Sequence, residues 1–280
     1  MLRINQAKKT YGNFTLSVSM EVKKGYITGV IGRNGAGKST TFKAILSLIH
    51  LDEGDITLFG QDAGKLSGSE KENLGVALSE SGFSDYLRIT DVAKIMKNCY
   101  KRFDERVFLE KCKQFGLPSD KQIKDFSTGM KAKLKVLVAM SHEARLLLLD
   151  EPTAGLDVVA RDELLDMIRE YMEDGEHSVL ISSHISTDLE GLCDDLYLIH
   201  DGKILLHEET DKLLSDYGLL KVSEEQYRTL DKQFILGTLK ENYGYRLITN
   251  EKQFYLENAP DIVVEKSSVD EVISVMTRGE

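Results

Sequence analysis

A glycine-rich segment with one lysine, GRNGAGKST at residues 32–40, is the strongest sign of chemistry in this sequence. It follows the apolar run Ile27–Ile31 and precedes Thr41–Ile49, which has the pattern of a helix. Glycines let backbone N–H groups converge on phosphate oxygens, and the start of the helix adds its positive end. Lysine supplies a cation to the outer phosphates, and the serine after it offers a hydroxyl to Mg²⁺. This phosphate loop therefore predicts a site for a nucleoside triphosphate and Mg²⁺.

A second candidate site follows the apolar run in LLLLDEP at 146–152. The run predicts a buried strand, so Asp150 and Glu151 emerge at the carboxyl edge of the sheet, where α/β proteins bind ligands. Asp150 is placed to hold Mg²⁺, and Glu151 can accept a proton from an attacking water. An alternative interpretation makes Asp150 a helix cap after a core strand.

Alternating strands and helices are expected to position these residues. Apolar runs at 27–31, 146–149 and 179–182 predict strands, and the segments 136–140 and 163–172 predict helices. Continuous apolar strands separated by helices are typical of a parallel sheet covered on both faces. At the start of the chain, residues 2–5 and 14–22 alternate like half-buried antiparallel strands.

Two segments depart from this alternation. Residues from about 79 to 140 are mostly helical in pattern and predict a helical subdomain. After the turn at Asp201-Gly202 the pattern changes again, and residues 212–280 predict a small α+β appendage. In the appendage we expect a strand at 219–222, a capped helix from Ser223, a hairpin of 245–249 with 253–257, a strand at 261–266 and a helix capped at Ser268.

Composition restricts the class of protein. The chain has 280 residues and a net charge of −10, with a pI near 5.2. An acidic chain argues against a nucleic-acid partner, which would require a basic footprint. No uncharged apolar stretch approaches the ~18 residues of a membrane span, and the start has no apolar core of signal-peptide length. The three cysteines lie far apart in sequence, which fits a reducing compartment. We therefore expect a cytoplasmic protein.

Further segments accompany these sites in a fixed order: Tyr11, FSTGM at 126–130, TAGLD at 153–157 and ISSH at 181–184. With the phosphate loop and LLLLDEP, they resemble the motifs of the ATP-binding subunits of ABC transporters over about residues 2–210. The resemblance implies an α/β fold. Its P-loop NTPase core would be of the ABC type, with an antiparallel β subdomain, a helical subdomain and the C-terminal α+β appendage. The expected division is 1–211 for the ATP-binding domain and 212–280 for the appendage.

The resemblance also implies a role for each motif. Tyr11 would stack on adenine, and His184 would contact the γ-phosphate and hold the attacking water beside Glu151. Ser127 and Gly129 would contact ATP bound to the opposite subunit, and Asp157 would cross the interface between subunits. Structural interpretations exist beside these: Ser127 and Asp157 can be helix caps, and Tyr11 can be a core aromatic.

With the phosphate loop added, the expected site residues are as follows. Glu151 and His184 are catalytic, and Ser39 and Asp150 bind Mg²⁺. ATP is bound by Tyr11, Gly32, Asn34, Gly35, Ala36, Gly37, Lys38, Ser39, Thr40, Ser127, Gly129 and Asp157.

Three positions in two segments depart from the family pattern. Ser79 stands where the family usually has a glutamine that touches Mg²⁺ and the water, and this side chain is too short for the full task. In the segment 126–130, Thr128 replaces a glycine and Met130 replaces a glutamine. The serine and the second glycine remain, so recognition of the γ-phosphate is expected to survive.

The resemblance implies a subunit that binds and hydrolyses ATP and energises a membrane transporter, with an exporter favoured. It would act as a homodimer or with a second ATP-binding subunit, at the inner face of the cell membrane. Closure of the pair would reach a separate multispanning permease through a groove near residues 83–100. The alternative is a nucleotide-binding regulatory module without efficient turnover, which the change at Ser79 favours and the intact Glu151 and His184 oppose. A soluble ABC ATPase that acts in DNA repair or on ribosomes is disfavoured. Such proteins carry a long coiled-coil insertion or two nucleotide domains in one chain, and this sequence shows neither pattern.

Overall fold

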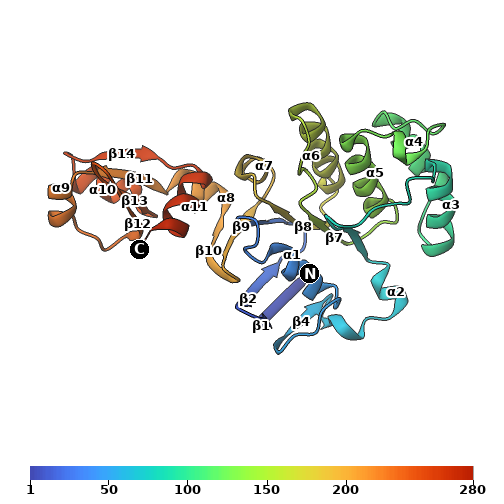
Figure 1. The fold of residues 1–280 in the computed structure, drawn as a ribbon, viewed down its shortest axis with the longest axis horizontal. Helices are drawn as coiled ribbons and strands as arrows, with labels where there is room; N and C mark the ends of the chain where they lie inside the picture. The colour runs from blue at the N-terminus through green and yellow to red at the C-terminus, as the bar shows by residue number, and fades with distance from the viewer. Residues whose placement is uncertain (280) are drawn as a thin grey trace.

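A ten-stranded sheet runs through the computed structural model, which describes residues 1–279. In order along the sheet, its strands are β5 (Gln61–Asp62), β4 (Glu53–Leu58), β1 (Leu2–Tyr11), β2 (Phe14–Val22), β10 (Lys203–Glu209), β9 (Asp195–His200), β3 (Ile27–Ile31), β8 (Ser178–Ser183), β7 (Leu146–Asp150) and β6 (Leu74–Ala77). The sheet has two portions (Figure 1). Strands β1, β2, β4 and β5 form an antiparallel portion, and β3 and β6–β9 form a parallel portion.

The parallel portion is the core of the part that carries the predicted phosphate loop. Every residue of β3, β7 and β8 is buried, as continuous apolar strands between two layers of helices must be. In β2, from Leu16 to Val22, buried and exposed residues alternate, because only one face of this antiparallel portion packs on the core. The strands predicted at 27–31, 146–149, 179–182 and 14–22 are present.

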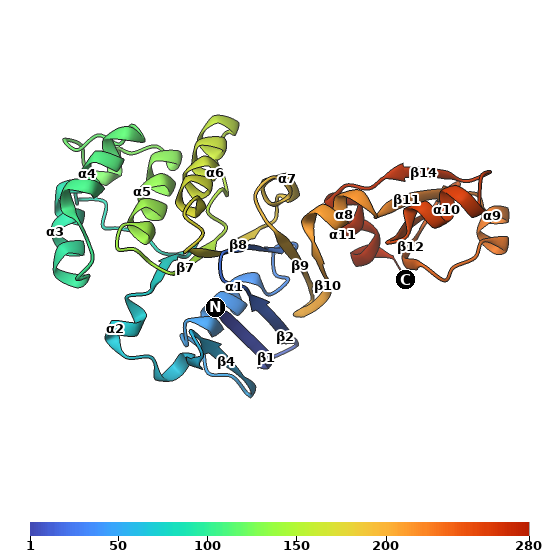
Figure 2. The same ribbon diagram turned by 180° about the vertical axis from the view of Figure 1, so that it is seen from behind.

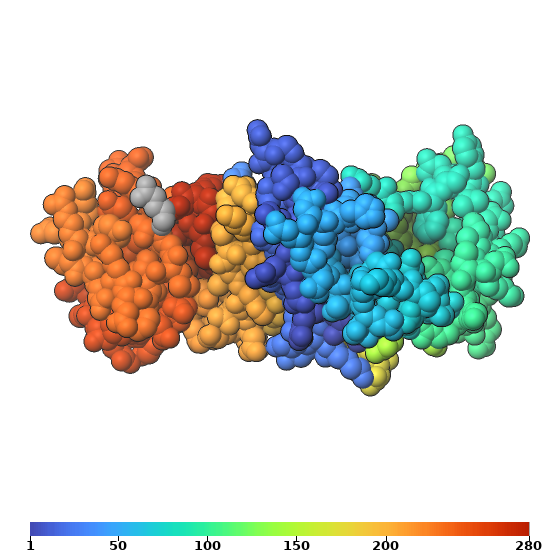
Figure 3. All heavy atoms as spheres, turned by 90° about the horizontal axis from the view of Figure 1, so that it is seen from below, coloured from blue at the N-terminus to red at the C-terminus, as the bar shows by residue number. Residues whose placement is uncertain are grey.

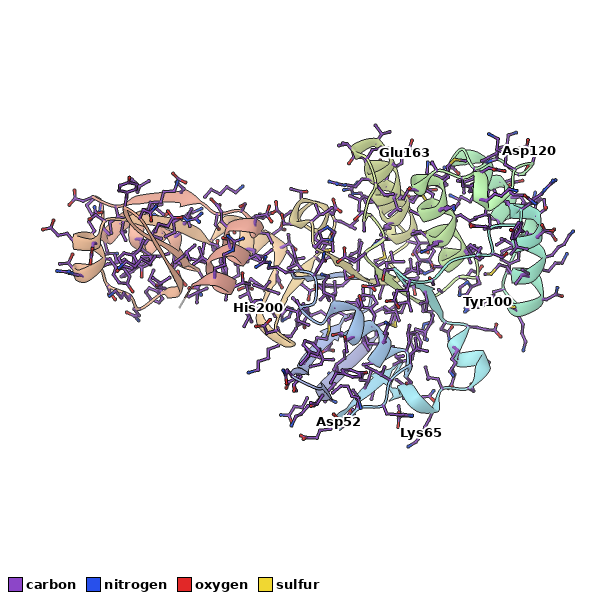
Figure 4. The ribbon with its side chains drawn as sticks, viewed as in Figure 1. Asp52, Lys65, Tyr100, Asp120, Glu163 and His200 are labelled. Carbon is purple, nitrogen blue, oxygen red and sulfur yellow. The ribbon has the colours of Figure 1, made fainter. Side chains whose placement is uncertain are left out.

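Seven helices accompany the sheet: α1 (Lys38–Ile45), α2 (Gly68–Lys71), α3 (Ile89–Cys99), α4 (Glu105–Gln114), α5 (Thr128–Met140), α6 (Val158–Met172) and α7 (Ser186–Glu190). Single 3₁₀ turns span Ala63–Lys65 and Ile123–Asp125. Helices α3, α4 and α5 gather at one end of the elongated molecule and form the helical subdomain (Figures 1 and 3). In the side-chain view, Tyr100 and Asp120 lie at this end, whereas Asp52 and Lys65 lie on the antiparallel portion (Figure 4).

The appendage occupies the opposite end of the molecule (Figures 2 and 3). Its elements are α8 (Thr210–Ser215), β11 (Gly218–Val222), α9 (Glu224–Thr229), β12 (Ile235–Glu241), β13 (Gly244–Thr249), α10 (Lys252–Asn258), β14 (Val263–Lys266) and α11 (Val269–Arg278). The four strands form a second, antiparallel sheet in the order β12-β13-β11-β14. Capping boxes begin α9 at Ser223 and α11 at Ser268, as the sequence predicts.

Two local predictions are wrong. The segment 253–257 is not the second strand of a hairpin but part of α10, and β13 pairs instead with β12 and β11. The helix buries Tyr255 and sets Phe254 edge-on against Phe234. The helix predicted at 41–49 begins earlier, at Lys38, and ends at Ile45. Ser47 follows with a φ of +54°, which takes the backbone out of the helix.

Candidate functional site

The phosphate loop joins the buried strand β3 to helix α1 and depends on its glycines for shape. Gly35 and Gly37 have φ angles of +83° and +115°, which L side chains rarely adopt. A Cβ on Gly32 would lie 2.4 Å from the carbonyl oxygen of Ile199 on β9. Three positions of the motif therefore require glycine for backbone reasons, and the loop opens directly into the first turn of α1.

Lys38 begins α1 and points back into the loop that precedes it. Its side chain is only 5% exposed, and its ammonium donates to the carbonyl of Gly32 at 2.6 Å. The same nitrogen lies 2.9 Å from Oε1 of Glu151. The structure thus brings together the cation of the phosphate loop and the carboxylate after β7, residues more than a hundred positions apart in sequence.

Glu151 bridges Lys38 and His184. Its second oxygen, Oε2, lies 2.6 Å from Nδ1 of His184 and accepts the backbone N–H of His184 at 3.3 Å. The Glu151 backbone has a φ of +52°, an uncommon conformation for a residue other than glycine. The Glu151 side chain is 12% exposed and that of His184 is 41% exposed, so the cluster opens to solvent on the histidine side.

Asp150 is buried beside this cluster and is held by two serines. The hydroxyl of Ser182 donates to Oδ1 at 2.6 Å, and the hydroxyl of Ser79 donates to Oδ2 at 3.0 Å. Ser182 Oγ also accepts the backbone N–H of Glu151 at 3.0 Å. One hydroxyl therefore links both acidic residues. The sequence analysis gave Ser182 no role, although a serine directly after the apolar run 179–181 was an available signal.

The side chains of Asp150 and Ser39 have the chemistry that Mg²⁺ prefers. A carboxylate from Asp150 and a hydroxyl from Ser39, in the first turn of α1, are hard oxygen ligands. Mg²⁺ commonly binds through one or two protein oxygens together with substrate phosphates. These two residues are the ones that would hold it.

Lys135 on α5 fixes the segment that carries Ser79. Its ammonium donates to the backbone carbonyls of Leu78 and Ser79 at 3.4 and 3.3 Å. Partial burial lowers the pKa of Lys135 from its usual value. Helix α5 of the helical subdomain therefore fixes the main chain at Ser79 by hydrogen bonds.

Ser127, Gly129 and Asp157 lie at helix starts outside the Lys38–Glu151–His184 cluster. Ser127 is the N-cap of α5 and accepts the N–H of Met130, and Asp157 is the N-cap of α6 and accepts the N–H of Ala160. A Cβ on Gly129 would lie 2.9 Å from Cβ of Ala160. The two helix starts are thus packed together, and both capping interpretations are correct.

Tyr11 ends β1 and is 46% exposed, so it is not a core aromatic. It pairs across the β1–β2 turn with Phe14, whose ring lies 3.2 Å from the place of a Cβ on Gly37. The ammonium of Lys9 lies 5.6 Å from the centre of the Tyr11 ring. The ring therefore stands at the surface near the phosphate loop.

Comparison with known proteins gives the family. The model of the ABC transporter family matches residues 16–154. The lantibiotic transport ATP-binding protein SrtF of Streptococcus pyogenes is 34% identical over 215 residues, 75% of this chain and 92% of that protein. The chain belongs to the ATP-binding subunits of ABC transporters. Its P-loop core and the antiparallel and helical parts around it follow the architecture expected from the sequence.

Solved ABC structures agree with this fold. The structure of an ATP-binding subunit of an ABC transporter has a TM-score of 0.68 and 26% identity, covering 76% of this chain and 91% of that one. A dimeric, post-hydrolysis ATP-binding cassette bound to ADP and Pi has a TM-score of 0.67 and 17% identity, covering 75% and 99%. That second likeness concerns the fold alone. Within residues 1–279 of this ABC subunit, none of the helices has the length and apolar character needed to span a bilayer.

Proposed function

We propose that this ABC subunit hydrolyses ATP and that Glu151 is the general base. The observation that carries the proposal is the position of Glu151 between the buried Lys38 ammonium and the His184 imidazole. A carboxylate between a phosphate-binding cation and a solvent-facing histidine is placed to take a proton from water that attacks the γ-phosphate. His184 orients the Glu151 carboxylate and the attacking water relative to each other.

The other site residues bind and orient the nucleotide. The phosphate loop, residues 32–40, directs backbone N–H groups and Lys38 at the β- and γ-phosphates. Ser39 and Asp150 would hold Mg²⁺, and the ion would supply positive charge against the phosphate oxygens. Tyr11, exposed near the loop, stacks on the adenine ring.

We further propose that two ATP-binding subunits close on ATP, in a homodimer or in a pair with a second subunit. Ser127 and Gly129 stand at the start of α5, where a helix presents its positive end to an anion. Asp157 lies at the adjoining start of α6. In the closed pair these residues face the nucleotide of the opposite subunit. A dimeric cassette of the same fold supports the pairing of two subunits.

Closure drives a separate multispanning permease at the inner face of the membrane, and an exporter is favoured. A cleft of about 410 Å³ separates the helical subdomain from the core and is lined by Ser79, Phe83 and Asp85, among others. This cleft reaches from Asp150 to the surface predicted for the permease contact. The similarity to a lantibiotic transport subunit supports an exporter.

The replacement Glu151→Gln tests the proposed base. Without the carboxylate, the rate of ATP hydrolysis should fall by about 10²–10⁴-fold, the usual contribution of general-base catalysis. Loss of one negative charge opposite the phosphates should also preserve a closed, ATP-bound dimer. Steady-state phosphate release and size-exclusion chromatography with Mg-ATP measure the two effects. Glu173→Gln, an exposed glutamate at the end of α6, is the matched control and should behave as the wild type.

Two outcomes would contradict this proposal. If Glu151→Gln hydrolyses ATP at the wild-type rate, another group is the base. If the wild type binds ATP but hydrolyses none even with its permease, the chain is a regulatory nucleotide-binding module.

A further inference from the structure

The short helix α7 begins two residues after His184 and packs against the strand that leads into the phosphate loop. Leu189 of α7 is fully buried, and its Cδ1 lies 3.3 Å from the place of a Cβ on Gly29 of β3. A shift of α7 would therefore displace the backbone that carries His184.

Helix α7 is also hydrogen-bonded to the loop that follows Glu151. Asp188 is 2% exposed, and its Oδ2 accepts the hydroxyl of Thr153 at 2.6 Å. Its Oδ1 lies 3.5 Å from Nε of Arg161 on α6. A buried carboxylate held by two partners fixes α7 relative to the residues just beyond Glu151.

The far end of α7 is bonded to the appendage. Oε1 of Glu190 accepts the backbone N–H of Val269, the first residue of α11, at 3.1 Å. A negative side chain at this place also interacts favourably with the positive end of α11. Val269, Val272 and Val275 of α11 are at most 2% exposed and belong to the same hydrophobic core as Leu189.

Helix α11 lies on the side of the appendage that faces the core, next to α7 and α8 (Figures 1 and 2). Between α11 and the phosphate loop remains a cavity of about 200 Å³, lined by Gly32 and Arg33 of the loop, by His184, and by Asp270, Ser274 and Arg278 of α11. The appendage thus borders the nucleotide site at a polar cavity and is hydrogen-bonded to α7, the helix that follows His184.

We propose that Glu190 is a positioning residue that couples the appendage to His184 and to the loop after Glu151. Through it, the placement of α11 sets the rate of hydrolysis. ATP binding stays unchanged, because the Leu189 contact with β3, the strand that leads into the phosphate loop, does not involve the Glu190 hydrogen bond. The effect on hydrolysis rests on the proposed ATPase function. The mechanical link between α11 and α7 does not.

The test compares Glu190→Ala with Glu190→Gln in the full chain. Alanine removes the acceptor for the Val269 N–H, whereas the amide oxygen of glutamine still accepts it. For Glu190→Ala we expect kcat to fall on the order of tenfold, since a misplacement of about 1 Å can cost about 10²-fold and a smaller one costs less. KM and the Kd for Mg-ATP should stay unchanged. Glu190→Gln should recover most of kcat, and Glu173→Ala is the control for loss of an exposed glutamate.

Hydrogen exchange provides a readout that is independent of turnover. Without nucleotide, the amides of residues 184–190 should exchange faster in Glu190→Ala than in Glu190→Gln, while those of β13 in the appendage stay the same in both. If the wild type hydrolyses nothing, the proposed ATPase fails, yet the exchange result still decides the coupling.

Three results would overturn the inference. One is wild-type kcat and wild-type exchange in Glu190→Ala. Another is faster exchange that includes β13, because general destabilisation would then explain it. The third is an equal loss of kcat in Glu190→Gln.

Discussion

Hydroxyl groups supply both hydrogen bonds that orient the Asp150 carboxylate. One comes from Ser182, the neighbour of Asp150 across the β7–β8 pair, and the other from Ser79, at the start of the helical subdomain. Ser79 is too short to reach as a glutamine would, but it meets the carboxylate directly. The expected glutamine would contact Mg²⁺ and the water, whereas Ser79 instead donates to the carboxylate of Asp150.

Ser79→Ala should weaken the binding of Mg²⁺. Loss of the hydroxyl leaves Asp150 held by Ser182 alone, and the loss of a group that hydrogen-bonds a metal ligand typically costs about 10–100-fold in metal affinity. We expect an increase of about tenfold in the Mg²⁺ concentration that half-saturates ATP binding, as measured by calorimetry. Ser79→Thr keeps the hydroxyl and should bind Mg²⁺ as the wild type does. An unchanged Mg²⁺ requirement in Ser79→Ala would show that Ser182 is sufficient.

At the scale of elements, periodic patterns predicted the strands and helices that carry the site. Continuous apolar runs gave β3, β7 and β8, and glycine spacing gave the phosphate loop, because backbone geometry allows few alternatives there. The segment 253–257 was misjudged, since its aromatic residues suit a strand and a short helix equally until tertiary packing decides. The links Glu190–Val269 and Thr153–Asp188 join residues distant in sequence. No local pattern marks such pairs.

Another long-range link ties three elements at His142, just after α5. Its Nε2 lies 3.0 Å from the carbonyl oxygen of Leu74 on β6, and its ring stacks on Tyr100 at the end of α3, with centroids 4.0 Å apart. Burial lowers the pKa of His142 below its ordinary value of 6.5. The imidazole is therefore packed as the neutral form.

This burial predicts a loss of stability in acid. Below pH 6.5 the unfolded chain binds a proton at His142 more readily than the folded chain does. The free energy of unfolding therefore falls as pH decreases from 6.5 toward the lowered pKa, by up to about 1.4 kcal/mol per pH unit. Urea unfolding at about pH 7.5 and pH 5.5 should show a smaller drop for His142→Gln than for the wild type. Equal drops would assign the acid sensitivity to other groups.

The cluster of Asp150, Glu151 and His184 lies between the helical subdomain at one end of the molecule and the appendage at the other. The helical subdomain holds Ser79 through Lys135, and the appendage holds α7 through Glu190. The first part carries the proposed permease and partner-subunit surfaces, and the second carries the proposed control. A displacement of either part would therefore change the positions of Asp150, Glu151 and His184.

The proposed closed pair makes a prediction about charge at the start of α5. Gly129 is a poor place to test it, because any side chain there meets Ala160 within 2.9 Å and disturbs the packing of α5 on α6. Ser127 is exposed and acts only as an N-cap in the single chain. Aspartate and asparagine cap helices about as well as serine, so Ser127→Asp and Ser127→Asn differ essentially in charge.

In the closed pair, the Ser127→Asp carboxylate would face the γ-phosphate of the opposite subunit, and like-charge repulsion would prevent closure. ATP should bind each chain with wild-type affinity, because the phosphate loop is intact. In a Glu151→Gln background, size-exclusion chromatography with Mg-ATP should then show a dimer for Ser127→Asn and only monomer for Ser127→Asp. A persistent dimer in the aspartate variant would place Ser127 outside the interface. Loss of ATP binding by that variant would instead place it in the site of its own chain.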